Sequence, residues 1–168
     1  IADLDLAFGT VALNFNQETS QGIADALNSP ERLDAQYLDG LLARCGEHLS
    51  ILASPANLDR VYDLDAYAFD LVIETLASIV PWTIIDLPHY WSAWGKRVLS
   101  TVDEVVIVAC PDLPSLRNVK NIVDSLEIAR PNDKTPHIVL NMVGVPRRPE
   151  ITVSEFAKAV GIEPVAAI

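Results

Sequence analysis

The stretch Trp82-Thr83-Ile84-Ile85-Asp86-Leu87-Pro88 decides the fold class, because a short apolar run there ends on an acidic residue and a proline. Apolar residues followed by an exposed acid are typical of a parallel strand whose carboxyl end reaches a ligand crevice. A second segment of this kind, Asp3-Leu4-Asp5-Leu6-Ala7-Phe8-Gly9-Thr10, opens the chain. Helical patterns separate the two segments, so we expect their acidic ends to share one polar pocket.

The composition indicates a folded domain rather than a disordered chain. The 168 residues suffice for one domain with a core, and 50% of them are hydrophobic. Lys and Arg number 12 against 23 Asp and Glu, a net charge of −11, which argues against broad contact with DNA phosphates or anionic lipid. We therefore predict no nucleic-acid partner. No apolar run reaches transmembrane length.

Apolar periodicity predicts strands and helices in alternation along the chain. The expected strands are residues 1–6, 48–53, 82–87, 104–110, 137–143 and 162–168. Residues 11–15 are expected to form either a turn of helix or a short surface segment. The other expected helices are one through 23–27, one between Asp34 and Gly46, and then 66–80, 91–101, 116–126 and 153–160. This order predicts an α/β fold of three layers, with a mostly parallel sheet, helices on both faces and right-handed crossovers.

Some helix boundaries follow from particular residues. Asp34 is expected to cap the helix after it, Gly46 to end that helix, and Gly161 to end the last one. Residues 19–21 offer N-cap residues for the expected helix through 23–27. Residues 57–65 have the composition of a polar loop.

The core of the sheet can also be anticipated. The run Val105-Val106-Ile107-Val108-Ala109 is apolar and mostly β-branched, which predicts a central strand covered on both faces. Trp82, Trp91 and Trp94 are expected to pack helices on the sheet rather than to stack on bases.

Three acids are the main candidates for chemistry. Asp3 and Asp5 lie two apart, so in a strand both would point to the same side; two solvated acids at a strand end are the alternative. Asp86 at the end of its strand could hold a hydrated Mg²⁺, or act as a helix cap or a turn residue. Two carboxylates ~4 Å apart repel by about 4 kcal/mol at an effective dielectric of 20, so converging acids require a cation.

Other polar residues give weaker signals. His48, His89 and His137 show no metal-ligand spacing, and we expect structural or surface roles for them. Cys45 and Cys110 form either a reduced pair or a single disulfide. Asn141 interrupts an apolar strand, as either a satisfied core polar group or a ligand reader at the strand end. No G-x-S-x-G sequence supports a hydrolase nucleophile.

Four stretches in order resemble the MinD/ParA-type ATPases of the P-loop superfamily. Residues 3–10 resemble their switch I segment, and residues 84–89 their Walker B and switch II segment. Ala109-Cys110-Pro111-Asp112-Leu113-Pro114-Ser115-Leu116-Arg117 is similar to the following strand-to-helix turn, and Val139-Leu140-Asn141-Met142-Val143 to the base-reading strand. The resemblance implies that Asp5 positions the hydrolytic water, that Asp86 and Asp3 lie at the Mg²⁺ shell through water, and that Asn141 reads adenine.

Within that superfamily the chain resembles the CpaE (TadZ) pilus-assembly branch, notably at residues 22–27 and 30–34. The resemblance implies a scaffold and localisation factor for type IVb (Flp/Tad) pilus assembly and secretion. It implies a homodimer that contacts the pilus machinery, including its secretion ATPase, in the cytoplasm at the inner-membrane face or cell pole. One alternative is an active ATP-hydrolysing dimeric switch. Another is a receiver-like regulatory domain, which would need a lysine at the end of a late strand.

The chain departs from this family in its phosphate loop. No G-x-x-x-x-G-K-[ST] sequence occurs, although such loops supply most of the phosphate binding. We expect residues 1–168 to be one partial ATPase domain, truncated at both ends, whose first strand and phosphate loop precede residue 1. This chain alone should bind ATP very weakly or not at all, and ATP with Mg²⁺ should bind the full-length protein only if its loop is intact. Residues 82–87 and 104–110 should then pair directly or flank a slot that another segment fills.

Overall fold

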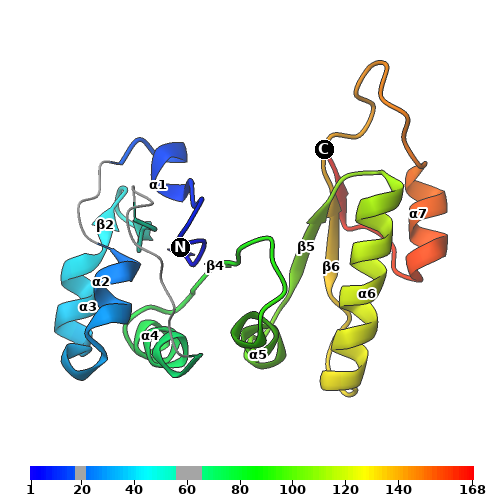
Figure 1. Ribbon diagram of the computed structural model, residues 1–168. Helices are drawn as coiled ribbons and strands as arrows, with labels where there is room; N and C mark the ends of the chain where they lie inside the picture. Colours follow the sequence, from blue (N-terminus) through cyan, green and yellow to red (C-terminus); the bar gives the residue numbers. More distant parts are fainter. Residues whose placement is uncertain (18–21, 56–65) are drawn as a thin grey trace. The chain divides into compact units, whose positions relative to one another are not determined.

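The computed structural model describes residues 1–17, 22–55 and 66–168. The chain forms two compact units, residues 1–95 and residues 96–168, each with its own strands and its own apolar core (Figure 1). The predicted cap residues 19–21 and the predicted loop 57–65 lie outside the described residues. No helix in the described segments combines the length and apolarity that a membrane span needs.

Parallel pairing organises the first unit. Strand β1 (Ala2–Asp3) pairs in parallel with β4 (Ile85–Asp86), and Ala2 also bridges Leu52 in parallel. Strands β2 (Ala43–Arg44) and β3 (Ser50–Ile51) form an antiparallel hairpin whose turn contains Gly46 at φ 110°. The prediction that Gly46 ends a helix is therefore wrong. A left-handed glycine serves a hairpin turn as well as a helix end.

Most helices of the first unit bury side chains in a common core, whereas the buried side chain of the first helix, Val11, lies in a smaller cluster with Ile51 and Ala53. They are α1 (Val11–Asn14), α2 (Ile23–Asn28), the short 3₁₀ helix η1 (Pro30–Arg32), α3 (Ala35–Leu41), α4 (Ala66–Ile79) and the start of α5 (Ala93–Thr101). Asp34 caps α3 as predicted, because its Oδ1 accepts a hydrogen bond from the Tyr37 N–H at 2.7 Å. The core includes the buried side chains Leu4, Ile23, Leu27, Leu38, Leu52, Phe69, Val72 and Leu76.

The tryptophans behave differently from one another. Trp94 stacks on Phe69 with ring centroids 4.1 Å apart, which joins α5 to α4 as expected for a packing residue. Trp82 is 87% exposed and Trp91 is 56% exposed, so the prediction that these two pack helices on the sheet is wrong.

The second unit is a parallel sheet with helices on one side. Strands β5 (Val106–Ala109), β6 (His137–Leu140) and β7 (Ala166–Ala167) lie in the order β5-β6-β7. Helices α6 (Leu113–Ala129) and α7 (Val153–Val160) pack against their buried side chains, and Gly161 ends α7 at φ 86°, as predicted. Val106 and Val108 are 60% and 64% exposed, so the prediction that both faces of β5 are covered is wrong for the described residues.

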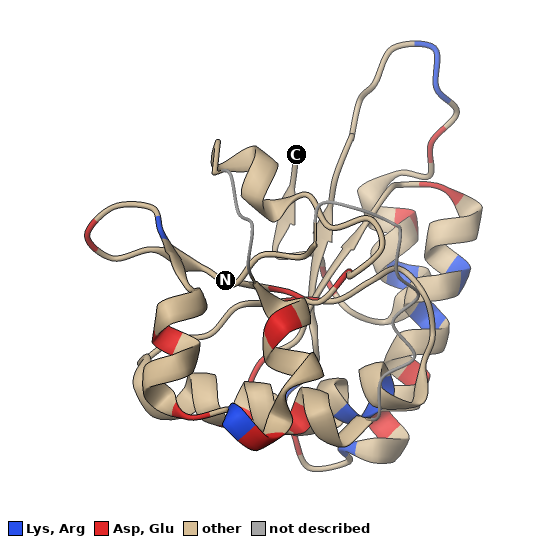
Figure 2. Ribbon diagram, turned by 60° about the vertical axis from the view of Figure 1, so that its left-hand side comes forward, with Lys and Arg blue, Asp and Glu red and all other residues tan. Residues whose placement is uncertain are grey.

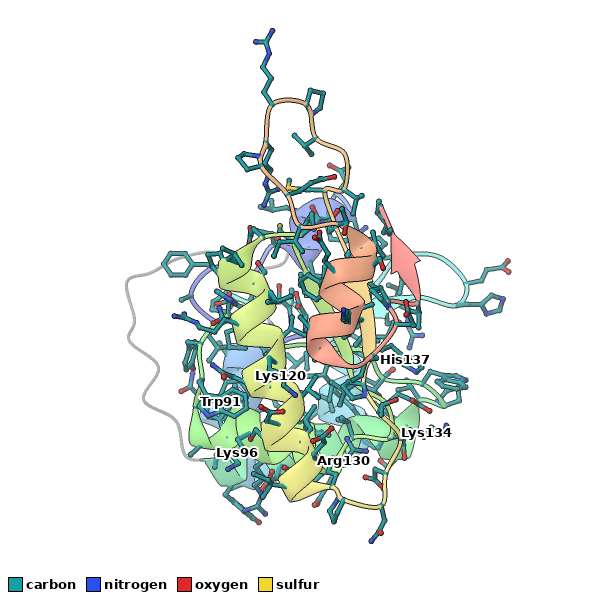
Figure 3. The ribbon with its side chains drawn as sticks, turned by 90° about the vertical axis from the view of Figure 1, so that its right-hand side faces the viewer. Trp91, Lys96, Lys120, Arg130, Lys134 and His137 are labelled. Carbon is teal, nitrogen blue, oxygen red and sulfur yellow. The ribbon has the colours of Figure 1, made fainter. Side chains whose placement is uncertain are left out.

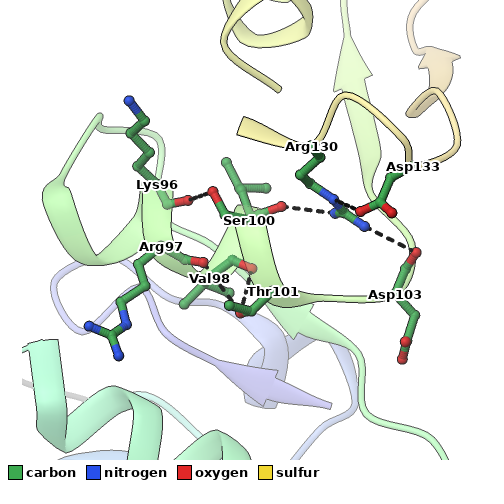
Figure 4. Close-up of polar contacts among 9 residues, drawn as sticks. Lys96, Arg97, Val98, Ser100, Thr101, Asp103, Arg130 and Asp133 are labelled. Carbon is green, nitrogen blue, oxygen red and sulfur yellow. Dashed lines mark hydrogen bonds and ion pairs between the residues drawn. The ribbon is translucent and has the colours of Figure 1, made fainter. Parts of the chain in front are cut away.

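Arg130 links the end of α6 to the end of α5. Its Nη1 donates to the Leu99 carbonyl at 2.9 Å, its Nη2 to the Asp103 carbonyl at 3.5 Å, and its Nε pairs with Asp133 at 2.6 Å (Figure 4). A guanidinium at a helix C-terminus offsets the negative end of the helix dipole. Lys134 and His137, which are labelled in Figure 3, both contact the carboxylate of Glu104, at 2.5 and 3.1 Å.

The sheets of both units have an open edge strand. Among the described residues, the ladder partner of β4 is β1, and the ladder partner of β5 is β6.

Candidate carboxylate site

Two of the three candidate acids lie side by side at the ends of neighbouring strands. The register of β1 and β4 places Asp3 opposite Asp86, and the Leu4 N–H donates to the Asp86 carbonyl at 2.9 Å. Each acid is the last residue of its strand. Carboxyl ends of parallel strands are where α/β sheets bind ligands, so this edge is the candidate site.

The carboxylate of Asp3 is fully buried and fully engaged. Its relative exposure is 0%, and it accepts hydrogen bonds from the Ser54 hydroxyl at 3.0 Å, the Val11 N–H at 3.1 Å and the Asp5 N–H at 3.2 Å. Hydrogen bonds to an ionised acceptor are the stronger kind, and a buried charge without them would be costly. The Asp3 carboxylate therefore connects three segments of the chain, at Asp5, Val11 and Ser54.

Gly9 makes this arrangement possible. A Cβ at this position would lie 2.2 Å from the Ser54 Oγ and 2.4 Å from each carboxylate oxygen of Asp3. The backbone of Gly9 is not left-handed, so the requirement for glycine comes from space and not from the backbone angle. The loop of residues 4–10 thus closes tightly over the Asp3 carboxylate.

Asp5 reaches the site through this loop and not through strand alternation. Strand β1 ends at Asp3, so the reasoning that placed Asp3 and Asp5 on one strand face is wrong. Beyond the strand the chain turns, with the Gly9 N–H donating to the Asp5 carbonyl at 2.8 Å and the Phe8 N–H to Asp5 Oδ1 at 3.0 Å. The Asp5 residue remains partly exposed.

Asp86 interacts electrostatically with both other acids. Partial desolvation raises the pKa of its exposed carboxyl above the usual value, and the negative charges of Asp3 and then Asp5 raise it further. The described part of the first unit has two basic side chains, and both are engaged elsewhere: Arg44 pairs with Asp39 at 2.8 Å, and Arg32 lies over the ring of Tyr37. Neither of these two arginines therefore offsets the negative charge of the three acids.

A magnesium ion fits part of this donor set. Carboxylate oxygens are suitable ligands, and Mg²⁺ needs only one or two of them because it keeps several waters. Asp86 is exposed and available, whereas Asp3 has no exposed surface and both of its oxygens are occupied by protein donors. The described residues contain no group of three side chains arranged to hold an ion by themselves.

Asn141 belongs to the second unit and lies just beyond the end of β6. It is exposed, so it is not a core polar group, and its Oδ1 accepts a hydrogen bond from the Met142 N–H at 2.9 Å. The loop that follows projects from this edge of the sheet and is basic near its tip, where the sequence has Arg147 and Arg148 (Figure 2). Arg148 ties that loop to Asp112 at 2.8 Å, and Asp112 caps α6 through the Ser115 N–H.

Solved structures with this architecture include a ParA family ATPase and MinD cell division proteins. A ParA family ATPase from Chlorobium tepidum TLS matches 99% of this chain at 27% identity with a TM-score of 0.83. The septum site-determining protein MinD from Pyrococcus horikoshii OT3, complexed with Mg-ADP, matches 99% at 18% identity with a TM-score of 0.81. The chain has the MinD/ParA-like fold.

The MinC:MinD cell division protein complex of Aquifex aeolicus also carries this fold, at 18% identity and a TM-score of 0.73 over 99% of the chain. The chain spans 69% of the length of the ParA family ATPase and 66% of both MinD chains. No protein-family model and no curated protein matches the sequence. These structural neighbours support membership of the MinD/ParA-like superfamily, and they do not distinguish a pilus-assembly branch within it.

Two residues of the carboxylate site were missed from the sequence. No site role was predicted for Ser54 or Gly9, yet both surround the Asp3 carboxylate. Nothing in the local sequence pairs Ser54 with an aspartate 51 positions earlier. The two cysteines are free and form no disulfide, and the described residues contain no cluster of metal-ligating side chains.

Proposed function

We propose that this chain is the larger part of a MinD/ParA-like ATPase domain whose acids form the Mg²⁺ side of a nucleotide site. In this proposal Asp86 holds a hydrated Mg²⁺, Asp3 lies behind it, Asp5 orients the attacking water and Asn141 reads the base. The observation that carries the proposal is the β1–β4 register, which sets Asp3 opposite Asp86 at a shared strand edge with Asp5 one turn beyond.

The domain assignment is part of the same proposal. Residues 1–168 would form one domain together with a further strand and a phosphate loop that precede residue 1. Two observations support this: β4 and β5 each have only one partner strand among the described residues, and the sequence holds no G-x-x-x-x-G-K-[ST] loop. Backbone donors in such a loop would supply the positive field that the acidic edge cannot provide.

The cellular role in this proposal is that of the CpaE (TadZ) branch. The full protein would act as a homodimeric scaffold and localisation factor for type IVb (Flp/Tad) pilus assembly, in contact with the secretion ATPase at the cytoplasmic face of the inner membrane. The support is the sequence resemblance at residues 22–27 and 30–34 together with the fold. Co-purification of the secretion ATPase with the tagged full-length protein tests this role, and mislocalised or absent pili in a deletion strain would agree with it.

An active ATP-hydrolysing switch is the second candidate. It is favoured by the partly exposed carboxylate of Asp5 beside Asp86, because a water-orienting acid must be open to solvent. A receiver-like domain has less support, because neither β5 nor β6 is followed by the lysine that such a domain requires.

Nucleotide assays on the full-length protein separate these candidates. Binding of Mg-ATP with turnover that Asp5→Ala abolishes would favour the switch, and binding without turnover would favour the scaffold. Asp39→Ala is the matched control, because Asp39 is an exposed acid of the same unit that pairs with Arg44 outside the site. A full-length protein that binds no Mg-ATP at all would refute the nucleotide site.

A further inference from the structure

A chain of hydrogen bonds runs from Ser54 to Asp5 within the first unit. The Ser54 hydroxyl donates to Asp3, whose other carboxylate oxygen accepts the Asp5 N–H, and the Asp5 carboxylate in turn accepts the Phe8 N–H. Asp3 also accepts the Val11 N–H at 3.1 Å, just where α1 begins. One buried carboxylate thereby fixes both ends of the loop that carries Asp5.

Ser54 is the immobile end of this chain. The residues before it are held on two sides: Leu52 exchanges backbone hydrogen bonds with β1, and the Ala53 carbonyl accepts the Ile23 N–H of α2 at 2.9 Å. A Cβ at Gly22 would lie 2.2 Å from the Ala53 oxygen, so α2 and this segment meet backbone to backbone. Ser54 itself is only 8% exposed. Its hydroxyl group is therefore held in place by the surrounding backbone and can position the Asp3 carboxylate through their hydrogen bond.

Between the buried residues Leu4 and Val11, few side chains of the loop are buried. Phe8 is 74% exposed, Ala7 and Thr10 are exposed, and Leu6 is only partly buried. Val11 is buried in a small cluster with Ile51 and Ala53, which anchors the far end. The position of Asp5 within this exposed loop thus depends on the hydrogen bonds that converge on Asp3.

We propose that Ser54 and Asp3 act together as positioning residues, holding the loop of residues 4–11, and with it Asp5, at the strand edge that carries Asp86. This inference rests on the proposed function, because that function is what makes Asp5 important. It assigns Asp3 the role of positioning the loop and not the role of a residue beside the ion. It also adds Ser54 to the site. The hydrogen-bond chain itself requires no nucleotide, so it can be tested independently.

Amide hydrogen exchange and carboxyl ¹³C NMR on the 168-residue chain at fixed pH test this proposal. Ser54→Ala should accelerate exchange at the amides of Asp5, Phe8 and Val11 by about tenfold, the effect of losing one hydrogen bond to a charged group. Exchange at Ile23 and Leu52, which lie outside the loop, should stay unchanged. The Asp5 side-chain carboxyl resonance should move, because its surroundings change.

Two further variants complete the experiment. Ser54→Cys keeps a weak donor and should give an intermediate acceleration with a smaller shift of the Asp5 resonance, and it carries the test if the alanine variant does not fold. Ser92→Ala is the matched control, since the Ser92 hydroxyl accepts the Gly95 N–H at 3.0 Å elsewhere in the unit. It should leave the loop amides and the Asp5 resonance as in the wild type.

Two results would overturn the positioning role. One is wild-type exchange at Asp5, Phe8 and Val11 in the Ser54 variants. The other is equal acceleration at Ile23 and Leu52, which would mean that Ser54 only stabilises the unit as a whole. Failure of the full-length protein to bind Mg-ATP would refute the proposed function instead, and it would not alter these exchange rates.

Discussion

Substituting Gly9 by alanine is the most direct test of how the candidate site is built. The added Cβ would have to occupy space within 2.2 Å of the Ser54 Oγ and 2.4 Å of both Asp3 oxygens. Atoms at that distance overlap, so the loop must lift or the hydroxyl must turn away. Either movement separates the buried Asp3 carboxylate from at least one of its three donors.

The expected cost combines two terms. Overpacking a tight site costs about 1–3 kcal/mol, and leaving a buried acceptor short of a partner costs about 1–3 kcal/mol more. We expect Gly9→Ala to lower the free energy of unfolding by about 3 kcal/mol in total. With a urea m-value of about 2 kcal/mol/M, the unfolding midpoint should fall by roughly 1.5 M.

Urea unfolding followed by circular dichroism measures this loss, and Gly40→Ala is the matched control. Gly40 lies in α3 of the same unit, and a Cβ there would meet no atom within 4 Å. Alanine in a helix is more favourable than glycine, so this variant should be about 0.5–1 kcal/mol more stable than the wild type. If Gly9→Ala were as stable as the wild type, the close packing of Gly9 against Asp3 would be refuted.

Three further substitutions have outcomes that the structure predicts. Asp86→Asn should raise the urea midpoint at pH 7 and leave it unchanged near pH 3. Because the pKa of Asp86 is raised in the folded protein, ionising this carboxyl destabilises the fold as pH rises above the usual carboxyl value. A lower midpoint at pH 7 would contradict this. Asp112→Ala should cost about 1 kcal/mol at pH 7 by removing the cap of α6. The hydrogen bond from the Ser115 N–H lowers the pKa of Asp112. The stability difference should therefore be complete above the usual carboxyl value, and it should shrink as pH falls from that value through the lowered pKa, which urea titrations at several pH values can follow. Arg130→Lys should cost about 1–2 kcal/mol in the same assay, because lysine cannot reproduce the guanidinium fork at Leu99 and Asp133, whereas the exposed Arg117→Lys should be neutral.

Much of the fold could be predicted because local signals and tertiary structure agree. The predicted helix 66–80 is α4 at 66–79, where apolar side chains recur at helical spacing and Pro81 follows. Asp34 caps α3 because its short carboxylate can reach the N–H three residues on. The meeting of Asp3 and Asp86 follows from parallel pairing, which brings carboxyl ends to one edge.

The remaining features depend on contacts distant in sequence. A β-branched run such as Val105–Val108 predicts a strand but does not say whether a second layer covers it. Gly46 carries the same signal for a hairpin turn as for a helix end. Ser54 and Gly9 belong to the site only because β3 and β1 place them around the Asp3 carboxylate, and no spacing rule connects these three positions.

The acidic residues are unevenly divided between the units. Residues 1–95 contain 14 of the 23 Asp and Glu residues and 3 of the 12 Lys and Arg residues, so this unit carries the whole net charge of −11. Such a surface concentrates divalent cations and repels free polyanions over roughly 8 Å, the screening distance at physiological salt. A triphosphate approaching this half of the chain should therefore arrive already paired with its metal, and its rate of encounter should rise as added salt weakens the repulsion.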